Sequence, residues 1–211
     1  SSFKNQWERE RFQRNYIING IKEANDADVA IFSDLDEIPN PLQISDVLSH
    51  FEDKTIYHFA QRMFNFYFNY ENIKNKLLSS SGDFINIEDK KWIGTRICSV
   101  GMARQHTVNF LREKECLQDI PAARVSDGGW HFSYMGGNNE EVHERVKRKL
   151  QSFSHEEFNH FRYYNPLHIK WKTMTGKDFL GRDAKFKKVA IDESYPEWLR
   201  LHYKGYPHFV L

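Results

Sequence analysis

The sequence predicts an α/β fold in which a mixed sheet is flanked by helices. Over residues 5–24, apolar side chains recur at helical spacing between Glu and Arg residues. The apolar run 29–32 follows after a short polar break, and a continuous run of this kind suits a strand buried on both faces. A helix that leads directly into such a strand is typical of folds that contain some parallel sheet.

Local signals place the remaining elements. Asn40 can cap a helix whose first residue is Pro41 and which ends near His50. Residues 55–60 and 64–70 alternate and are rich in aromatic side chains, which predicts two strands of a hairpin. The other expected elements are a loop over most of 71–90, strands within 92–103 and 124–133, helices over 138–151 and 155–163, and irregular structure over the last 40 residues.

The composition is ordinary for a soluble globular protein, with 40% apolar and 28% charged residues. We expect residues 1–211 to form a single domain. Lys and Arg number 30 against 29 Asp and Glu, so the chain lacks the overall positive charge typical of nucleic-acid-binding proteins. No apolar run reaches the roughly 18 residues of a transmembrane helix. The oligomeric state is left open.

The two cysteines, Cys98 and Cys116, do not have the spacing of a metal site. Two cysteines are too few for a disulfide scaffold, so we expect reduced thiols and a cytoplasmic protein, with one disulfide as the alternative. No signal peptide opens the chain, and the helical pattern starts almost at once, as in a chain that begins within a fold.

An acidic segment follows the apolar run 29–32 directly. Asp34, Asp36 and Glu37 lie within four positions. Such carboxylates repel one another, and burial raises their pKa values unless a cation compensates. Oxygen ligands suit Mg²⁺ and Mn²⁺, and ligands of open α/β sheets bind beyond the carboxyl ends of strands. In an extended backbone the two aspartates point to one side and Leu35 points into the core. The alternative is an acidic turn without a ligand.

This segment resembles the signature of family-17 glycosyltransferases, in which Asp-x-Asp-Glu-Ile-Pro follows an apolar strand. The best-known members are the β-1,4-mannosyl-glycoprotein β-1,4-N-acetylglucosaminyltransferases. Three further stretches resemble the same family, and their order and spacing agree with it from about residue 7 to residue 160. They are WERE at 7–10 with QRN at 13–15, GWHFSY at 129–134 with the glycines at 136 and 137, and KLQSFSH at 149–155.

The resemblance implies a GT-A-like mixed sheet flanked by helices, here without its first strand-helix units. It also implies inverting, metal-dependent transfer of a sugar, expected to be N-acetylglucosamine, from a UDP-sugar donor to a glycan acceptor hydroxyl. The implied cofactor is Mn²⁺ or Mg²⁺. If the chain is a fragment of a eukaryotic enzyme, the Golgi lumen replaces the cytoplasm as the expected compartment.

The resemblance also assigns roles in a metal site. Asp36 is the first candidate for direct metal ligand, and Asp34 is expected to reach the metal through water or to bind the donor ribose. Glu37 either ligates or holds the loop. His131 is a candidate late metal ligand, with a core position as the alternative reading. Trp130 could stack on a sugar or belong to the core.

Basic residues are candidates for holding the donor diphosphate. Lys149 and His155 flank a Ser-Phe-Ser turn, and Arg14 lies on the helix before the apolar strand. Solvated helix faces and surface salt bridges are the alternatives for these residues.

The catalytic base is expected to be a carboxylate, because an inverting transferase must deprotonate the acceptor hydroxyl. Asp127 is the first candidate, and Glu140 and Glu156 are the alternatives.

Two other classes of protein compete with the transferase. Segment 30–36 also resembles the opening of haloacid-dehalogenase-type phosphatases, but Glu37 and Ile38 depart from that motif. A non-catalytic sugar-binding or scaffold protein with the same fold is the second alternative.

Overall fold

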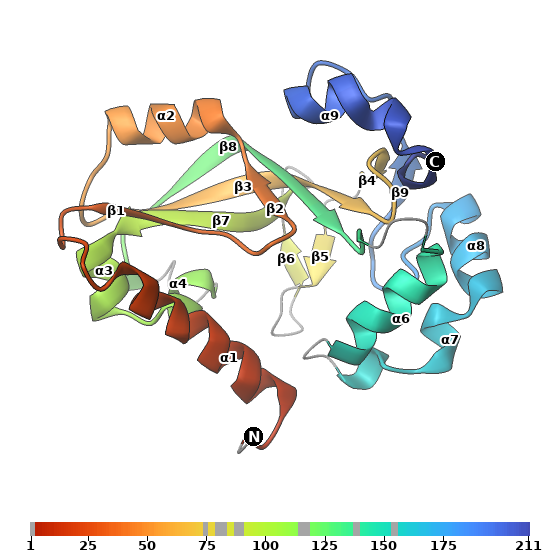
Figure 1. Ribbon diagram of the computed structural model, residues 1–211, viewed down its shortest axis with the longest axis horizontal. Coiled ribbons are helices and arrows are strands. Elements are labelled where there is room, and N and C mark those ends of the chain that lie inside the picture. Colours follow the sequence, from red (N-terminus) through yellow and green to blue (C-terminus); the bar gives the residue numbers. More distant parts are fainter. Residues whose placement is uncertain are drawn as a thin grey trace. The chain divides into compact units, whose positions relative to one another are not determined.

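The computed structural model describes residues 3–73, 76–78, 84–86, 91–113, 119–136, 140–152 and 156–211. Its fold is mixed α/β, with a curled mixed sheet flanked by helices, which confirms the predicted class (Figure 1). The chain divides into two compact units, Ser1–Gln61 with Ile93–Trp130, and Arg62–Trp92 with His131–Leu211. The expectation of a single domain stays a prediction.

The predicted first helix is confirmed, and it ends earlier than expected. Helix α1 (Gln6–Tyr16) begins at Asn5, whose side chain accepts a hydrogen bond from the Glu8 N–H at 2.9 Å. It continues as the 3₁₀-helix η1 (Ile17–Ile21). Ile18 and Ile21 pack on the core of the first unit.

Strand β1 (Val29–Phe32) forms where it was predicted, but it is buried on one face only. It pairs antiparallel with β7 (Trp92–Ser99). Ala30 and Phe32 are buried under the helices, whereas Val29 is 37% and Ile31 44% exposed. The prediction of burial on both faces was wrong, because β1 is the end strand of the sheet and its second face is only partly covered.

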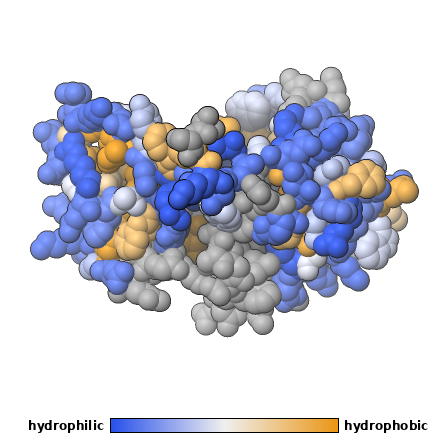
Figure 2. All heavy atoms as spheres, turned by 90° about the horizontal axis from the view of Figure 1, so that it is seen from below, coloured by the Kyte–Doolittle hydropathy of each residue, from blue (hydrophilic) through white to orange (hydrophobic). Residues whose placement is uncertain are grey.

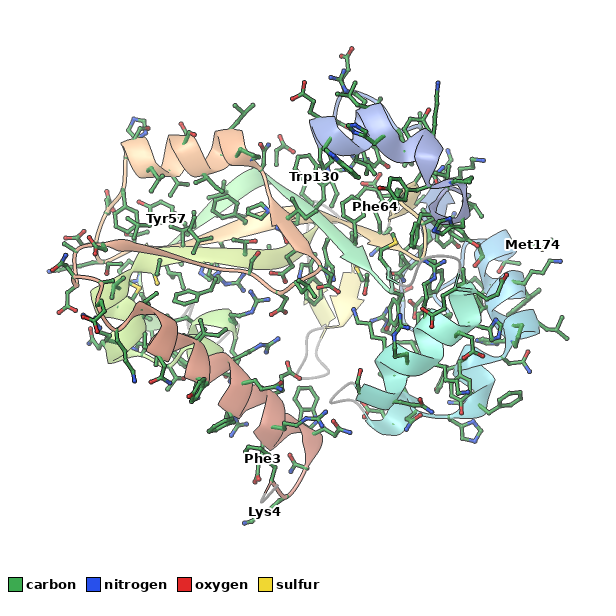
Figure 3. The ribbon with its side chains drawn as sticks, viewed as in Figure 1. Phe3, Lys4, Tyr57, Phe64, Trp130 and Met174 are labelled. Carbon is green, nitrogen blue, oxygen red and sulfur yellow. The ribbon has the colours of Figure 1, made fainter. Side chains whose placement is uncertain are left out.

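Helix α2 (Pro41–Ser49) confirms the prediction drawn from the Asn-Pro pair. The Asn40 side chain accepts a hydrogen bond from the Leu42 N–H at 3.1 Å, and Pro41 occupies the first turn. Val47 packs with Tyr57 and Phe59 in a cluster beneath this helix. Figure 3 shows Tyr57 between α2 and the strands.

Strand β3 (Ile56–Asn65) is one long strand, where two strands over 55–60 and 64–70 were expected. The polar residue that interrupts the aromatic pattern, Gln61, is buried and donates a hydrogen bond to Thr95 Oγ1 at 3.0 Å. This hydrogen bond of the amide nitrogen lets a polar side chain be buried within the strand, so the strand continues through it. The hairpin itself exists further on, where β4 (Tyr70–Asn72) pairs with the end of β3 and places Glu71 opposite Phe64.

The second unit is built on β4, on β9 (Phe186–Lys188), which pairs with it, and on a group of helices. Phe64, labelled in Figure 3, and Phe66 are buried in this unit, and the ring of Phe64 stacks on that of Phe132 with centroids 5.0 Å apart. The helices are α6 (Val142–Ser152), α7 (Phe161–Tyr164), α8 (Pro166–Thr175) and α9 (Glu197–His202).

Two regions are more regular than expected. The stretch 71–90, predicted to be mostly loop, contains β5 (Lys76–Leu78) paired with β6 (Phe84–Asn86). The last 40 residues, predicted to be irregular, contain β9 and α9. The remaining elements are β2 (Glu37–Pro39), α3 (Val100–Gln105), α4 (Val108–Arg112), β8 (Ala122–Ser133), η2 (Glu156–Phe158), η3 (Tyr203–Gly205) and η4 (Pro207–Phe209).

Apolar side chains on the surface form small, separate patches among polar residues on the face seen in Figure 2. Several exposed apolar residues lie on helices, including Phe12, Tyr16 and Met174. Among the described residues, no helix combines the length and the apolar character that crossing a membrane would require.

His58 makes the stability of the fold depend on pH. It is 3% exposed, and burial together with the nearby charge of Arg96 lowers its pKa from 6.5 to about 3. Between these pH values the unfolded chain binds a proton that the folded chain does not, so the free energy of unfolding falls as the pH falls. We expect His58 to contribute about 1.4 kcal/mol per pH unit in this window. Urea unfolding at several pH values measures this slope.

The His58→Phe variant is expected to lose this part of the slope while keeping a similar side-chain volume. His50→Gln, at an exposed histidine in the same unit, is the matched control and is expected to keep the slope. Equal slopes for wild type and His58→Phe would contradict the assignment.

Candidate functional site

The acidic segment after β1 is a tight turn. The Glu37 N–H donates to the Asp34 carbonyl at 3.0 Å, and the Asp34 N–H donates to Glu37 Oε2 at 3.0 Å. The extended backbone assumed from the sequence is therefore wrong here. Leu35, expected to point into the core, is fully exposed at the tip of the turn. The alternation of sides in a strand cannot be used to place Asp34 and Asp36 together.

Arg112, at the end of α4, holds two of the acidic side chains. Its Nη2 donates to Glu37 Oε1 at 2.7 Å and to Asp34 Oδ2 at 2.8 Å, and its Nη1 donates to Glu37 Oε2 at 3.1 Å. The side chain of Arg112 is 6% exposed and that of Glu37 is 0% exposed. This is a buried, two-pronged ion pair, the strongest geometry between arginine and a carboxylate.

The positive charge of Arg112 compensates the negative charges of the acidic turn. Burial by itself would lower the pKa of Arg112, but the charge and hydrogen bonds of Glu37, with smaller effects of Asp34 and Asp36, raise that pKa above its ordinary value. The guanidinium therefore stays charged. The sequence suggested that a divalent cation must compensate these carboxylates. Asp34 and Glu37 do not need one, because Arg112 already compensates the charge of both.

A second arginine reaches the turn from α1. Arg14 Nη2 lies 3.3 Å from Asp34 Oδ2 and 2.9 Å from Glu10 Oε1. Arg14 thus forms the surface ion pair that was its structural alternative, and it also contacts the acidic turn, while its role in holding the donor stays a prediction. Both arginines contact Oδ2 of Asp34, whose side chain is 38% exposed.

Asp36 follows Leu35 in the turn and is half-buried. It is near enough to Arg112 to raise the pKa of that guanidinium. No group of three or more His, Cys, Asp or Glu side chains in the described part of the chain is arranged to hold a metal ion. Mg²⁺ in nucleotide-dependent enzymes needs only one or two protein carboxylates, because substrate phosphates supply further oxygens. Asp34 and Asp36 stay the predicted metal ligands.

The base of the turn is held by hydroxyl and amide groups. Ser33 Oγ donates to the Glu37 carbonyl at 3.1 Å and lies 2.6 Å from Thr95 Oγ1, which also accepts from Gln61. Gly94 passes so close to this network that an added Cβ would lie 1.8 Å from Gln61 Oε1. Hydrogen bonds therefore link the residue after β1 and the strands β2, β3 and β7 at the base of the acidic turn.

Asp127, the candidate base, lies where β8 passes beside the end of β2. Asn40 donates from Nδ2 to the Asp127 carbonyl at 3.1 Å and from its backbone N–H to the Gly128 carbonyl at 2.9 Å. Asp127 has φ of 52° and its side chain is exposed. Gly129 has φ of 126°, and a Cβ there would lie 2.1 Å from the Ile38 carbonyl oxygen, so only glycine fits. The strand pairing thus brings Asp127 next to Asn40, three residues after Glu37.

The other candidates lie in the second unit, apart from Trp130, which ends the first unit and is 8% exposed, as its core alternative requires. His131 is 6% exposed, with its ring against the edge of Trp92 at a centroid distance of 4.7 Å. Little of the imidazole surface is therefore accessible to a ligand. Its role as metal ligand stays a prediction.

Lys149 lies on α6 in the second unit. It donates from Nζ to Ser133 Oγ at 3.0 Å, and the ammonium lies 4.8 Å from the centre of the Tyr134 ring. The Glu140 side chain pairs with Arg148. His155 and the side chain of Glu156 lie outside the described residues.

Arg112 is the residue that the sequence reasoning missed. Three neighbouring carboxylates did indicate that a cation must lie beside them. The sequence holds 30 Lys and Arg residues, however, and no local pattern distinguishes Arg112 from the others. Comparisons of the chain with protein family models, with curated proteins and with solved structures found no match.

Proposed function

We propose that this protein is a metal-dependent, inverting glycosyltransferase that moves a sugar from a UDP-sugar to a glycan hydroxyl, on a GT-A-like fold. The observation that carries the proposal is the ordered acidic turn at the carboxyl end of β1. Arg112 and the backbone bonds between Asp34 and Glu37 order it, and Asp36 lies at its partly exposed side. The motif resemblance to family 17 supports the same reaction.

In this proposal the three carboxylates of the turn have different roles. Asp36 would be the direct ligand of Mn²⁺ or Mg²⁺, and Asp34 would reach the same ion through water or bind the donor ribose. The ion, once bound, neutralises the charge that develops on the leaving diphosphate. Glu37 is a positioning residue, since its side chain is wholly buried against Arg112.

The acceptor hydroxyl must lose a proton as it attacks the anomeric carbon. The new bond joins the acceptor oxygen to that carbon, the bond from the carbon to the diphosphate oxygen breaks, and the proton passes to a carboxylate. Asp127 is the proposed base. Its exposed side chain and the pairing of β2 with β8 support this role.

Arg14 adds a cation at the rim of the turn. Its side chain is 23% exposed, so it can shift from Asp34 toward a donor phosphate at little cost. Arg112 is too deeply buried for such a movement, and it acts by fixing the orientation of Asp34.

A sugar-binding protein without catalysis is the second candidate. One observation favours it, because Arg112 already compensates Asp34 and Glu37, and a stable turn of this kind has no need of a metal.

A donor screen separates the candidates. The protein is incubated with Mn²⁺ and each of a set of UDP-sugars, with and without a glycan acceptor mixture, and products are read by mass spectrometry. The proposal expects one donor to give UDP together with a glycan heavier by one sugar, only when Mn²⁺ is present. Intact donors throughout would contradict it, as would hydrolysis of a simple phosphate ester.

A further inference from the structure

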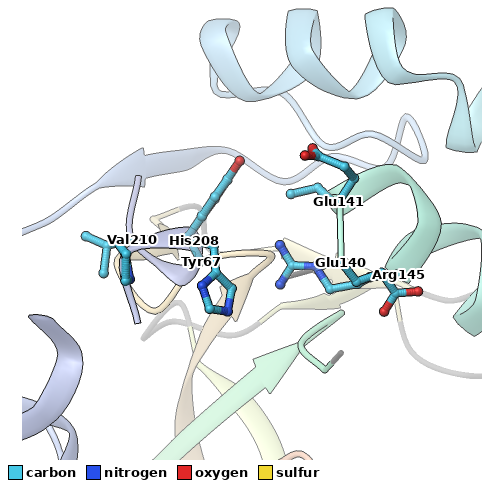
Figure 4. Close-up of a pocket in the computed structure, with 8 residues that line it drawn as sticks. Tyr67, Glu140, Glu141, Arg145, His208 and Val210 are labelled. Carbon is cyan, nitrogen blue, oxygen red and sulfur yellow. The ribbon is translucent and has the colours of Figure 1, made fainter. Parts of the chain in front are cut away.

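The second unit contains a pocket of about 430 Å³ beside the start of α6, within the range of roughly 300–1,000 Å³ for small-ligand sites. All of its lining residues belong to this unit. Figure 4 shows Tyr67 and His208 on one side, and Glu140, Glu141 and Arg145 on the other.

Arg145 is the most deeply buried charged residue of the pocket. The residue is 2% exposed, its Nη1 donates to the Phe66 carbonyl at 3.1 Å, and its guanidinium lies 4.7 Å from the centre of the Phe209 ring. Its Nε has no hydrogen-bond partner among the described residues. Burial lowers the pKa of Arg145 despite the nearby Tyr67 and Glu140. A buried donor without a partner is costly, and the guanidinium to which it belongs lines the pocket.

Two further groups bring hydrogen-bonding capacity to the same space. His208 Nε2 is buried and, within the described ranges, has no hydrogen-bond partner. Burial raises the pKa of Tyr67, so its phenol stays protonated and able to donate at neutral pH. Together with Arg145, these residues place polar groups on both sides of the pocket (Figure 4).

The carboxylates of Glu140 and Glu141 supply acceptors. Glu140 is already paired with Arg148, so the charge of Glu141 is left to balance the guanidinium of Arg145, and the lining has no net positive charge to hold a phosphate or another anion. A ligand with hydroxyl groups can both donate to the carboxylates and accept from the donors.

The remaining wall of the pocket is apolar, formed by Val142, Pro207 and Val210. Interleaved donors and acceptors beside an apolar wall match the surface of a saccharide, which carries hydroxyl groups around its rim and C–H groups on its faces. We infer that this pocket binds a neutral saccharide, as part of the glycan acceptor. The inference rests on the proposed function only where it identifies the saccharide as part of the glycan acceptor. The binding of a saccharide to this pocket does not itself require catalysis.

Isothermal titration of the protein with neutral disaccharides, and separately with inorganic phosphate, tests the inference without Mn²⁺ or UDP. We expect at least one disaccharide to bind and phosphate not to bind. Tyr67→Phe should weaken the disaccharide about fivefold, because it removes one hydrogen bond, and Glu141→Gln should weaken it by about as much, because it replaces a charged acceptor by a neutral one.

Glu144→Gln is the matched control, because Glu144 lies on the same helix but outside the pocket, and its affinity should equal that of the wild type. Binding of phosphate alone, binding of no ligand, or equal affinity in all variants would overturn the inference. Sugar binding with the expected variant effects but no transfer in the donor screen would sustain the pocket and remove the proposed function.

Discussion

Replacing Arg112 by methionine is expected to lower the free energy of unfolding by about 3–5 kcal/mol. Methionine fills much of the same space but leaves the carboxylate of Glu37, which is 0% exposed, without its cation. A buried charge that loses its partner is among the most damaging changes in a folded protein. Urea unfolding at neutral pH, followed by tryptophan fluorescence, measures the change.

Two variants separate this effect from a general loss of arginine. Arg14→Met removes the partly exposed arginine that contacts the same Asp34, and it should cost only about 0–1 kcal/mol. The double variant Arg112→Met with Glu37→Gln should recover part of the loss, because the uncompensated carboxylate is gone. If Arg112→Met and Arg14→Met were equally mild, the buried ion pair would not be what stabilises the turn.

Asp36→Asn is expected to reduce sugar transfer by about 100-fold or more and to leave stability nearly unchanged. The amide keeps the shape of the side chain but loses the charge that would hold a divalent ion, and metal stabilisation of a leaving group is worth several kcal/mol. Asp36 is half-buried, and Arg112 keeps its stronger partners Glu37 and Asp34. The initial rate of UDP formation at saturating donor and Mn²⁺ measures the effect.

Asp46→Asn supplies the comparison for this substitution. Asp46 is exposed on α2, away from the acidic turn in the same unit, so transfer should remain at the level of the wild type. Full activity in Asp36→Asn would show that the metal ligand is another residue.

The elements that could be predicted from the sequence have short-range causes. Asn40 and Pro41 form a helix start that depends on bonds within a few residues, and the prediction was confirmed. The same pair recurs at Asn165 and Pro166, where the Asn165 side chain accepts from the Leu167 N–H at 2.9 Å. The start of helix α8 was therefore predictable by the same rule, although no helix was predicted there.

The acidic turn could be located from the sequence, but its geometry could not. A bond between residues 34 and 37 competes with an extended backbone, and periodicity alone does not decide between them. Arg112 lies 75 positions from Glu37 along the chain, and only the packing of α4 beside β1 and β7 brings them together. Charge compensation over such a separation leaves no local pattern, which is why a metal ion was expected to do what an arginine does.

The most direct test of the acidic turn as a donor site is the melting temperature of the wild-type protein with MnCl₂, with UDP, and with both. A ligand that binds only the folded state increases the free energy of unfolding, by about 2.7 kcal/mol at a hundred times its dissociation constant. The melting temperature rises as a result. We predict a clear rise with both together, little change with either alone, and no joint effect in Asp36→Asn. An equal rise of the melting temperature with UDP in the presence and absence of Mn²⁺ would contradict a metal-assisted donor site at this turn. No rise under any of these conditions would contradict it as well.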